Sequence, residues 1–167
     1  AINGLKVYFP PQKGRQYTIG ADPAAGNPTS DDSAVEVMDK ETGEEVATLA
    51  GKFEPATFGA HIDAVGTWYN RAAVMLEVNN HGHAVMLWLK ANSNLPIMEG
   101  PDGKPGWTTT NKSKAILYAT AGECFRDGEV LLHDLSVLTQ LASIEGSTLK
   151  APEGQHDDRA IACCLCV

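Results

Sequence analysis

The fold class is decided by residues 55–78, PATFGAHIDAVGTWYNRAAVMLEV. Pro55 suits the first turn of a helix. Apolar side chains then recur at the spacing of one helical face, at Phe58, Ile62, Val65 and Tyr69. The run AAVMLEV that follows is apolar at nearly every position, which is typical of a strand buried on both faces. A helix that leads into such a strand predicts a parallel crossover of right-handed sense, and therefore an α/β fold.

The segment before this crossover has the pattern of three strands. Apolar positions alternate with smaller or polar ones in QYTIGAD (16–22) and again in SAVEVMD (33–39), which is the period of a strand. The residues between them, PAAGNPTSD (23–31), have turn chemistry throughout. Residues 39–43 favour a hairpin turn ahead of EVATLAG (45–51). Three consecutive antiparallel strands are therefore expected.

The segment after the crossover is expected to be mainly helical. Asn80 suits the cap of a helix over residues 81–91, and a long Gly- and Pro-rich loop follows over 92–110. The remaining elements are a helix over 111–125, a short strand over 128–133, a helix over 135–144 with Leu135, Leu138 and Leu141 on one side, and a last helix over 157–167. The whole order predicts an α/β fold whose mixed central sheet has three antiparallel strands followed by parallel strands, flanked by helices.

The composition predicts one globular domain. The chain has 167 residues, of which 43% are hydrophobic and 20% are charged, and this is enough apolar material for one sizeable core. We expect the domain to span residues 15–167 and residues 1–14 to be an arm or the remnant of a linker. No apolar run approaches the roughly 20 residues of a membrane-spanning helix, and the N-terminus lacks the layout of a signal peptide.

The net charge excludes one class of protein and leaves another open. Thirteen Lys and Arg residues against 21 Asp and Glu residues give a formal charge of −8. A small basic module that holds nucleic acid by its net charge is therefore excluded. A nucleic-acid enzyme whose acidic site is neutralised by divalent cations remains possible.

Acidic residues stand where a mixed sheet would bring them together. Asp22 ends the first of the three strands, Glu77 lies near the end of the strand after the crossover, and Asp157 and Asp158 open the last helix. If the strands of Asp22 and Glu77 are neighbours, both carboxylates project at the sheet edge where α/β folds place their ligand sites. Crowded carboxylates repel one another unless they are neutralised, and their hard oxygen atoms suit Mg²⁺ or Mn²⁺.

Each of these acids also has an ordinary structural explanation. Asp22 precedes a proline and fits a turn, while Asp157 fits a helix cap that is favoured by the helix dipole. Glu77 differs because a carboxylate in an apolar strand is costly to bury without a partner, so a functional role is favoured for it. The joint pattern is more specific than any one member.

Several stretches carry a resemblance to a known family. YTIGADPAAG with DDSAVEV, then YNRAAVMLEVNNHGHAV, then GQHDDRAIA closely resemble the nuclease domain of large terminase subunits of tailed bacteriophages. They occur in the family's order over most of the chain, from Tyr17 to Ala162. The resemblance implies a ribonuclease H-like fold and a metal-dependent endonuclease that cuts concatemeric double-stranded viral DNA. The implied mechanism uses two metal ions, which activate water and stabilise the leaving oxygen.

The resemblance also implies the ligands. Asp22, Glu77, Asp157 and Asp158 would be the catalytic residues and would bind two Mg²⁺ or Mn²⁺ ions. Asp158 would be the principal ligand of the last pair, with Asp157 accessory to it. Many relatives have Asp where this chain has Glu77, and the longer side chain should change the metal spacing without changing the reaction class.

Five further residues are candidates for contacts with DNA or with the metal ligands. His156 directly precedes the acid pair, His81 follows the Glu77 strand, Lys112 and Lys114 lie at a helix start, and Arg15 precedes the first strand. Solvated or capping roles are the ordinary explanation for each. Cys163, Cys164 and Cys166 with His156 offer a zinc site, but they lack a CxxC pair, and we expect the cysteines to be small core residues.

The expected partners follow from the same resemblance. They are double-stranded DNA, an ATPase motor domain normally on the same polypeptide, the small terminase subunit and the capsid portal, in the cytoplasm of the host during virion assembly. The chain itself has no phosphate-binding GxxxxGK[ST] motif, so it should not pump DNA alone. The alternatives are a non-catalytic module that docks on DNA or on the portal, and a resolvase-like nuclease specific for branched DNA.

Overall fold

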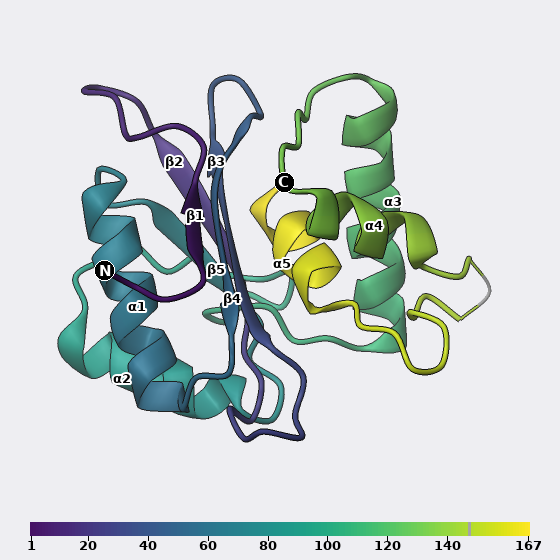
Figure 1. Ribbon diagram of the computed structural model, residues 1–167, viewed down its shortest axis with the longest axis horizontal. Helices are drawn as coiled ribbons and strands as arrows, with labels where there is room; N and C mark the ends of the chain where they lie inside the picture. Colours follow the sequence, from purple (N-terminus) through teal and green to yellow (C-terminus); the bar gives the residue numbers. More distant parts are fainter. Residues whose placement is uncertain (147) are drawn as a thin grey trace.

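The protein has three layers, with a central sheet between two groups of helices (Figure 1). The computed structural model describes residues 1–146 and 148–167. Helices α1 and α2 cover one face of the sheet, and α5 lies on the other face with α3 and α4 outside it. The strands are β1 (Leu5–Val7), β2 (Tyr17–Asp22), β3 (Ser33–Asp39), β4 (Glu45–Gly51) and β5 (Ala73–Leu76). The helices are α1 (Pro55–Trp68), α2 (Gly82–Asn92), α3 (Asn111–Arg126), α4 (Leu135–Ser143) and α5 (Asp158–Cys166).

The sheet has the order β1-β4-β3-β2-β5. Strands β2, β3 and β4 pair antiparallel with their neighbours, whereas β5 pairs parallel to β2 after the α1 crossover. The three antiparallel strands are therefore confirmed. Of the parallel strands predicted after them, the described residues form β5, and further parallel pairing is limited to isolated bridges. Within the expected N-terminal arm, β1 pairs antiparallel with β4. In the described part of the chain, no helix is long and apolar enough to cross a membrane.

The loop after α2 extends the sheet beyond β5. Two isolated parallel bridges join Val74 to Ile97 and Glu77 to Trp107. The backbone N–H of Trp107 donates to the carbonyl of Leu76 at 2.7 Å, and the N–H of Val78 donates to the carbonyl of Trp107 at 3.0 Å. This pairing satisfies polar groups at the edge of β5 and brings the loop alongside Glu77.

Strand alternation decides which residues meet which helical layer. Ile19 and Ala21 of β2 are fully buried in the core beneath α1 and α2, so Thr18, Gly20 and Asp22 face α5. Thr18 Oγ1 donates to the carbonyl of Cys166 at 3.1 Å. A Cβ atom at Gly20 would lie 1.9 Å from the carbonyl oxygen of Ala162, so only glycine allows α5 to approach β2 this closely.

Helix α5 is the central helix of its layer. Its residues from Ala160 to Cys166 are all buried, because small and medium side chains let it pack between the sheet and the outer helices α3 and α4. Cys163, Cys164 and Cys166 are free thiols among these core residues, as expected, and no zinc site forms around them in the described residues.

Two local predictions were wrong, and one predicted helix is less buried than its leucines suggest. Asn80 does not cap α2: it has a φ of 47°, a left-handed turn conformation that Asn tolerates, and His81 is the capping residue. The segment 128–133 forms only one bridge, from Leu131 to Glu44, because it runs past the sheet instead of along an edge. In α4 the buried side chain is Val137, while Leu135 and Leu138 are 75% and 44% exposed.

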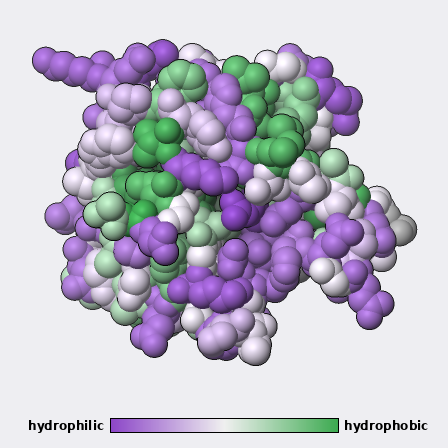
Figure 2. Space-filling model, viewed as in Figure 1, coloured by the Kyte–Doolittle hydropathy of each residue, from purple (hydrophilic) through white to green (hydrophobic). Residues whose placement is uncertain are grey.

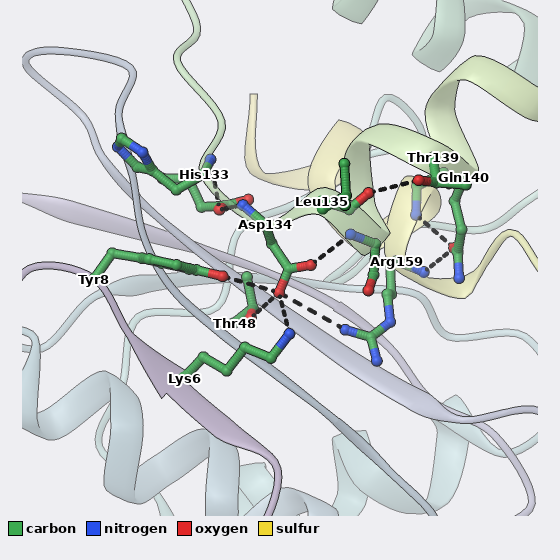
Figure 3. A network of polar contacts seen from close by, with 12 residues as sticks. Lys6, Tyr8, Thr48, His133, Asp134, Leu135, Thr139, Gln140 and Arg159 are labelled. Atoms are coloured by element: carbon green, nitrogen blue, oxygen red, sulfur yellow. Dashed lines mark hydrogen bonds and ion pairs between the residues drawn. The ribbon is translucent and has the colours of Figure 1, made fainter.

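A buried polar network joins the sheet to α4 on the α5 side (Figure 3). The Asp134 carboxylate accepts hydrogen bonds from Lys6 Nζ at 3.0 Å, Tyr8 at 3.1 Å and Thr48 at 2.9 Å. Its other oxygen accepts from the backbone N–H of Ser136 at 2.8 Å and so caps α4. Asp134 therefore ties β1, β4 and α4 together.

Next to this network, two glutamates are buried side by side. Glu36 of β3 and Glu45 of β4 are 1% and 0% exposed, and Glu36 Oε1 and Glu45 Oε2 are buried without a hydrogen-bond partner among the described residues. Burial raises the pKa of Glu36 well above its ordinary value, and the neighbouring Glu45 carboxyl raises it further. The charges of Cys166 and Asp134 also raise the pKa of Glu36.

We expect Glu36→Gln to stabilise the protein at neutral and alkaline pH. The amide keeps a donor toward Glu45 without a charge, and the expected gain is about 1–2 kcal/mol. Because the pKa of Glu36 is raised in the folded state, the wild-type carboxyl destabilises the fold only as the pH rises above its unfolded pKa of 4.5. Urea unfolding at pH 4.5 and pH 8 checks this, and a gain that is equal at both pH values would contradict it.

Candidate metal centre

Asp22 and Glu77 meet at the carboxyl ends of two paired strands. Ala21 is in register with Leu76 across the β2–β5 pair, and the backbone N–H of Glu77 donates to the carbonyl of Ala21 at 2.9 Å. Both side chains are half-buried and project toward the α5 side. Burial raises the pKa of Asp22 well above its ordinary value, and the hydrogen bond to Glu77 and the charges of Glu77, Asp158 and Asp157 raise it further.

The Glu77 side chain is also held from the loop before α3. Thr109 Oγ1 donates to Glu77 Oε1. Behind Glu77 the chain turns sharply into α2, where a Cβ atom at Gly82 would lie 2.0 Å from the carbonyl oxygen of Glu77. Glycine is therefore required for α2 to start against the strand that carries the acid.

Asp158 begins α5 on the same side of the sheet, and its charge acts on Asp22. Within the described residues its carboxylate forms a group within 4.8 Å with Asp31 and His156, and not with Asp22 and Glu77 together. Asp158 is 7% exposed, and no hydrogen bond reaches its carboxylate from the residues that the structure describes. Burial raises the pKa of Asp158 to about 6; the charges of Asp31, Asp157 and Asp32 also raise it, and His156 opposes them. The Asp158 oxygens are not fully enclosed, so water or a cation can reach them.

Asp157 differs from Asp158 because it has a cation of its own. Lys114 Nζ of α3 lies 3.0 Å from Asp157 Oδ2, and it also lies 5.8 Å from the centre of the Tyr118 ring. The Tyr118 hydroxyl is buried without a hydrogen-bond partner among the described residues. Lys114, expected as a contact for DNA, thus contacts one of the acids.

The start of α5 is capped by a side chain of α4. Asp157 occupies the N-cap position but makes no capping hydrogen bond. Instead, Gln140 Oε1 accepts from the backbone N–H groups of Arg159 at 2.8 Å and Ala160 at 3.2 Å (Figure 3). The two carboxylates at the start of α5 are therefore not needed to satisfy the helix terminus.

A second group of oxygen and nitrogen donors adjoins Asp158. Asp31 Oδ1 lies 2.7 Å from His156 Nδ1, and donor atoms of Asp31, His156 and Asp158 all lie within 4.8 Å of one another. His156 is therefore brought to the acids, as the sequence suggested. Asp31 was missed because it lies in the turn-rich stretch 23–31, although the paired acids Asp31 and Asp32 were a signal for it.

The other three candidates lie apart from this group. Arg15 precedes β2 at the opposite end from Asp22, about 20 Å away along the strand, and it pairs with Asp39 at 3.2 Å and Glu41 at 2.8 Å. His81 and Lys112 are exposed, and neither makes an ion pair in the described part of the chain. Both stand at helix starts, at the start of α2 and in the first turn of α3.

The acids lie toward a hydrophilic end of the molecule. In the view of Figure 2, hydrophilic residues cover much of the lower half, where the loop from β2 to β3 and the start of α5 lie in Figure 1. The donor atoms are mainly carboxylate oxygens, which are the ligands that Mg²⁺ and Mn²⁺ prefer. The arrangement is suited to hold divalent cations at an accessible edge of the sheet.

Solved structures share this architecture over almost the whole chain. A large terminase nuclease from the thermophilic phage G20c, with bound cobalt, superposes with a TM-score of 0.83 at 20% sequence identity, over 99% of this chain and 87% of that one. The chain has the fold of large terminase nuclease domains. The ribonuclease H-like fold predicted from the sequence is therefore confirmed.

Two further structures with the terminase nuclease fold are similarly close. The G20c nuclease with bound magnesium has a TM-score of 0.81 at 19% identity and covers 99% of this chain and 87% of its own. The large terminase nuclease domain of Thermus phage P74-26 has a TM-score of 0.79 at 20% identity, with 99% and 85% covered. No protein-family model matches the chain, and no curated protein sequence matches it.

Proposed function

We propose that this chain is a metal-dependent endonuclease domain of a viral DNA-packaging terminase, which hydrolyses phosphodiester bonds of double-stranded DNA with two divalent cations. The observation that carries the proposal is the meeting of Asp22, Glu77 and Asp158 at one end of the sheet in a terminase nuclease fold. Each acid comes from a different element, so the grouping is a property of the fold and not of local sequence.

The residues fit divalent cations. Asp22 and Glu77 lie side by side at the ends of paired strands, and the neighbouring acids raise the pKa of Asp22 well above its ordinary value; a divalent cation would offset this repulsion. Asp22, Glu77 and Asp158 would hold the ions, because the charge of Asp157 is already compensated by Lys114. When bound, the cations would activate water and stabilise the leaving oxygen of the phosphodiester.

The chain's own residues would position the substrate and the acids. Glu77 and Asp22 are fixed by the β2–β5 pairing, and Asp158 is fixed by the packing of α5 on β2. Lys112 and His81 are exposed at the starts of α3 and α2 and are candidates to meet DNA phosphates, which would orient the duplex without reading its sequence. With a charge of −8, the domain should bind DNA weakly and in a salt-sensitive manner.

The wider setting is part of the same proposal. The motor domain, the small terminase subunit and the capsid portal would bring DNA to this domain in the cytoplasm of the infected host. Support comes from the names of the structural neighbours, which are nucleases of large terminases.

Incubation of the purified chain with supercoiled plasmid tests the proposal. We expect nicking and linearisation with Mn²⁺ or Mg²⁺, and none with EDTA. A folded chain that binds DNA and does not cut with either metal would favour a non-catalytic docking module. A parallel assay on a four-way junction distinguishes a resolvase-like enzyme, which would cut the branched substrate at a much lower protein concentration than linear duplex.

A further inference from the structure

A hydroxyl group from the loop before α3 rests on one of the proposed metal ligands. Thr109 Oγ1 donates to Glu77 Oε1, and Thr109 is half-buried beside it. The two residues lie on separate segments, so this contact is not a consequence of their order in the chain. Glu77 has more side-chain torsions than an aspartate would have, and an ordered glutamate therefore loses more conformational freedom.

The backbone of Thr109 is itself held by one side chain. Asn79 Nδ2 donates to the carbonyl of Thr109 at 2.9 Å, and the N–H of Thr109 donates to Asn79 Oδ1 at 3.2 Å. Asn79 is only two residues beyond Glu77. The same short segment thus carries the acid and fixes the residue that restrains it.

The loop is anchored on both sides of this contact. On one side, Trp107 bridges to Glu77 through the backbone. On the other side, Thr110 and Ser113 form a capping box at the start of α3, and Ser113 Oγ also donates to the carbonyl of Thr108 at 2.8 Å. The Thr109 hydroxyl is therefore supported by ordered backbone and is not a freely rotating surface group.

We infer that Thr109, held by Asn79, is a positioning residue that fixes the Glu77 carboxylate for cation binding; the inference rests on the proposed function. The hydroxyl occupies one lone pair of Oε1 and limits rotation of the carboxylate. Groups that orient a metal ligand in this way typically change metal affinity by about 10-fold to 100-fold when they are removed.

Calorimetric titration of the DNA-free chain with Mn²⁺ tests the inference through binding alone. For Thr109→Val, which keeps the shape and removes the hydroxyl, we expect a dissociation constant about 10-fold higher or more. Thr109→Ser should restore an affinity close to that of the wild type. The matched control is Thr108→Val, the same change at the exposed neighbouring threonine, which should leave Mn²⁺ affinity unchanged. Wild-type affinity in Thr109→Val would overturn the inference.

A double-mutant cycle gives a second readout that needs no metal. Thr109→Val and Glu77→Ala are made singly and together, so that each single variant removes the hydrogen bond, and their urea unfolding midpoints are measured in EDTA. If the hydroxyl acts on the carboxylate, the two shifts are non-additive, whereas additive shifts would overturn the inference. Should the wild type bind no Mn²⁺, the proposed function would fail in its metal requirement, and the cycle alone would still decide whether Thr109 positions Glu77.

Discussion

Asp22→Asn is expected to abolish cleavage and to make the protein more stable. The substitution removes a carboxylate that would hold a cation directly. The loss of activity should therefore exceed the roughly 100-fold loss that follows when a residue that only orients a metal ligand is removed. Stability should rise by about 1–2 kcal/mol at pH 8 without metal, because a half-buried charge beside Glu77 and Asp158 is removed. Plasmid nicking and urea unfolding measure the two effects.

The pH dependence of this gain follows from the raised pKa of Asp22. In the folded state the pKa of Asp22 lies well above 3.8. Asp22 therefore lowers the free energy of unfolding of the wild type only as the pH rises from 3.8 toward the folded pKa. The gain should therefore shrink as the pH falls toward 4. Millimolar Mn²⁺ should reverse the order of stability, since binding stabilises only the chain that holds the ion.

Glu54→Gln is a matched control for Asp22→Asn. It also exchanges a carboxylate for an amide, but Glu54 is exposed at the start of α1 and makes no capping hydrogen bond with its side chain. It should leave cleavage and stability unchanged. Full cleavage by Asp22→Asn would place the active site elsewhere, or show that the activity belongs to a contaminant.

Asp134→Asn is expected to have the largest effect on stability, in the destabilising direction. One Asp134 oxygen accepts hydrogen bonds from Lys6, Tyr8 and Thr48. An asparagine at this site would present either its NH2 group, which cannot accept these hydrogen bonds, or its uncharged carbonyl oxygen, which is a weaker acceptor. Breaking a buried network of this kind costs about 3–5 kcal/mol, which corresponds to a fall in Tm of about 10 °C for a chain of this length.

The contribution of Asp134 to stability changes with pH in the opposite direction to that of Asp22, because folding lowers the pKa of Asp134 and raises the pKa of Asp22. Burial alone would raise the pKa of Asp134, but the hydrogen bonds from Lys6, Thr48, Ser136 and Tyr8 outweigh it and hold the pKa well below its usual range. Its contribution is therefore present above pH 3.8 and is lost as the pH falls below that value. Tyr8→Phe removes one donor and should cost only about 1 kcal/mol. If the Tm of Asp134→Asn equals that of the wild type at pH 7, the network does not stabilise the fold.

The sheet and the first two acids were predictable because they follow from local pattern and connectivity. Asp22 and Glu77 each end a recognisable strand, and the prediction that they lie close together was conditional on their strands being neighbours, which the β2–β5 pairing shows. Strand alternation and the crossover predicted the strands. The choice of Asp158 as a third acid also depended on the resemblance to terminase nucleases.

The supporting residues were not predictable because they depend on contacts between loops and distant helices. Thr109 lies in a loop whose path no periodicity describes, and Gln140 lies on a predicted helix whose partner the sequence does not indicate. A hydroxyl or an amide at such a position resembles any polar surface group. Lys114 was predicted to contact DNA, but it forms an ion pair with Asp157. This ion pair depends on the packing of α3 near the start of α5, which the sequence pattern does not indicate. Glu36 occupies a polar position in an alternating strand, so the pattern did not indicate that it is buried. Its burial depends on the packing of α5 against the sheet.

Because Asp158 follows β2 and β5 in the chain, the acidic group can form only after α5 has been synthesised. During translation, β2 and β5 are synthesised well before Asp158. The sheet that carries Asp22 and Glu77 can therefore form before the third acid has been synthesised. α5 must then insert between the sheet and two helices that precede it. If the chain is the proposed nuclease, a nascent chain would lack Asp158, and with it the complete acidic group, until translation has passed α5.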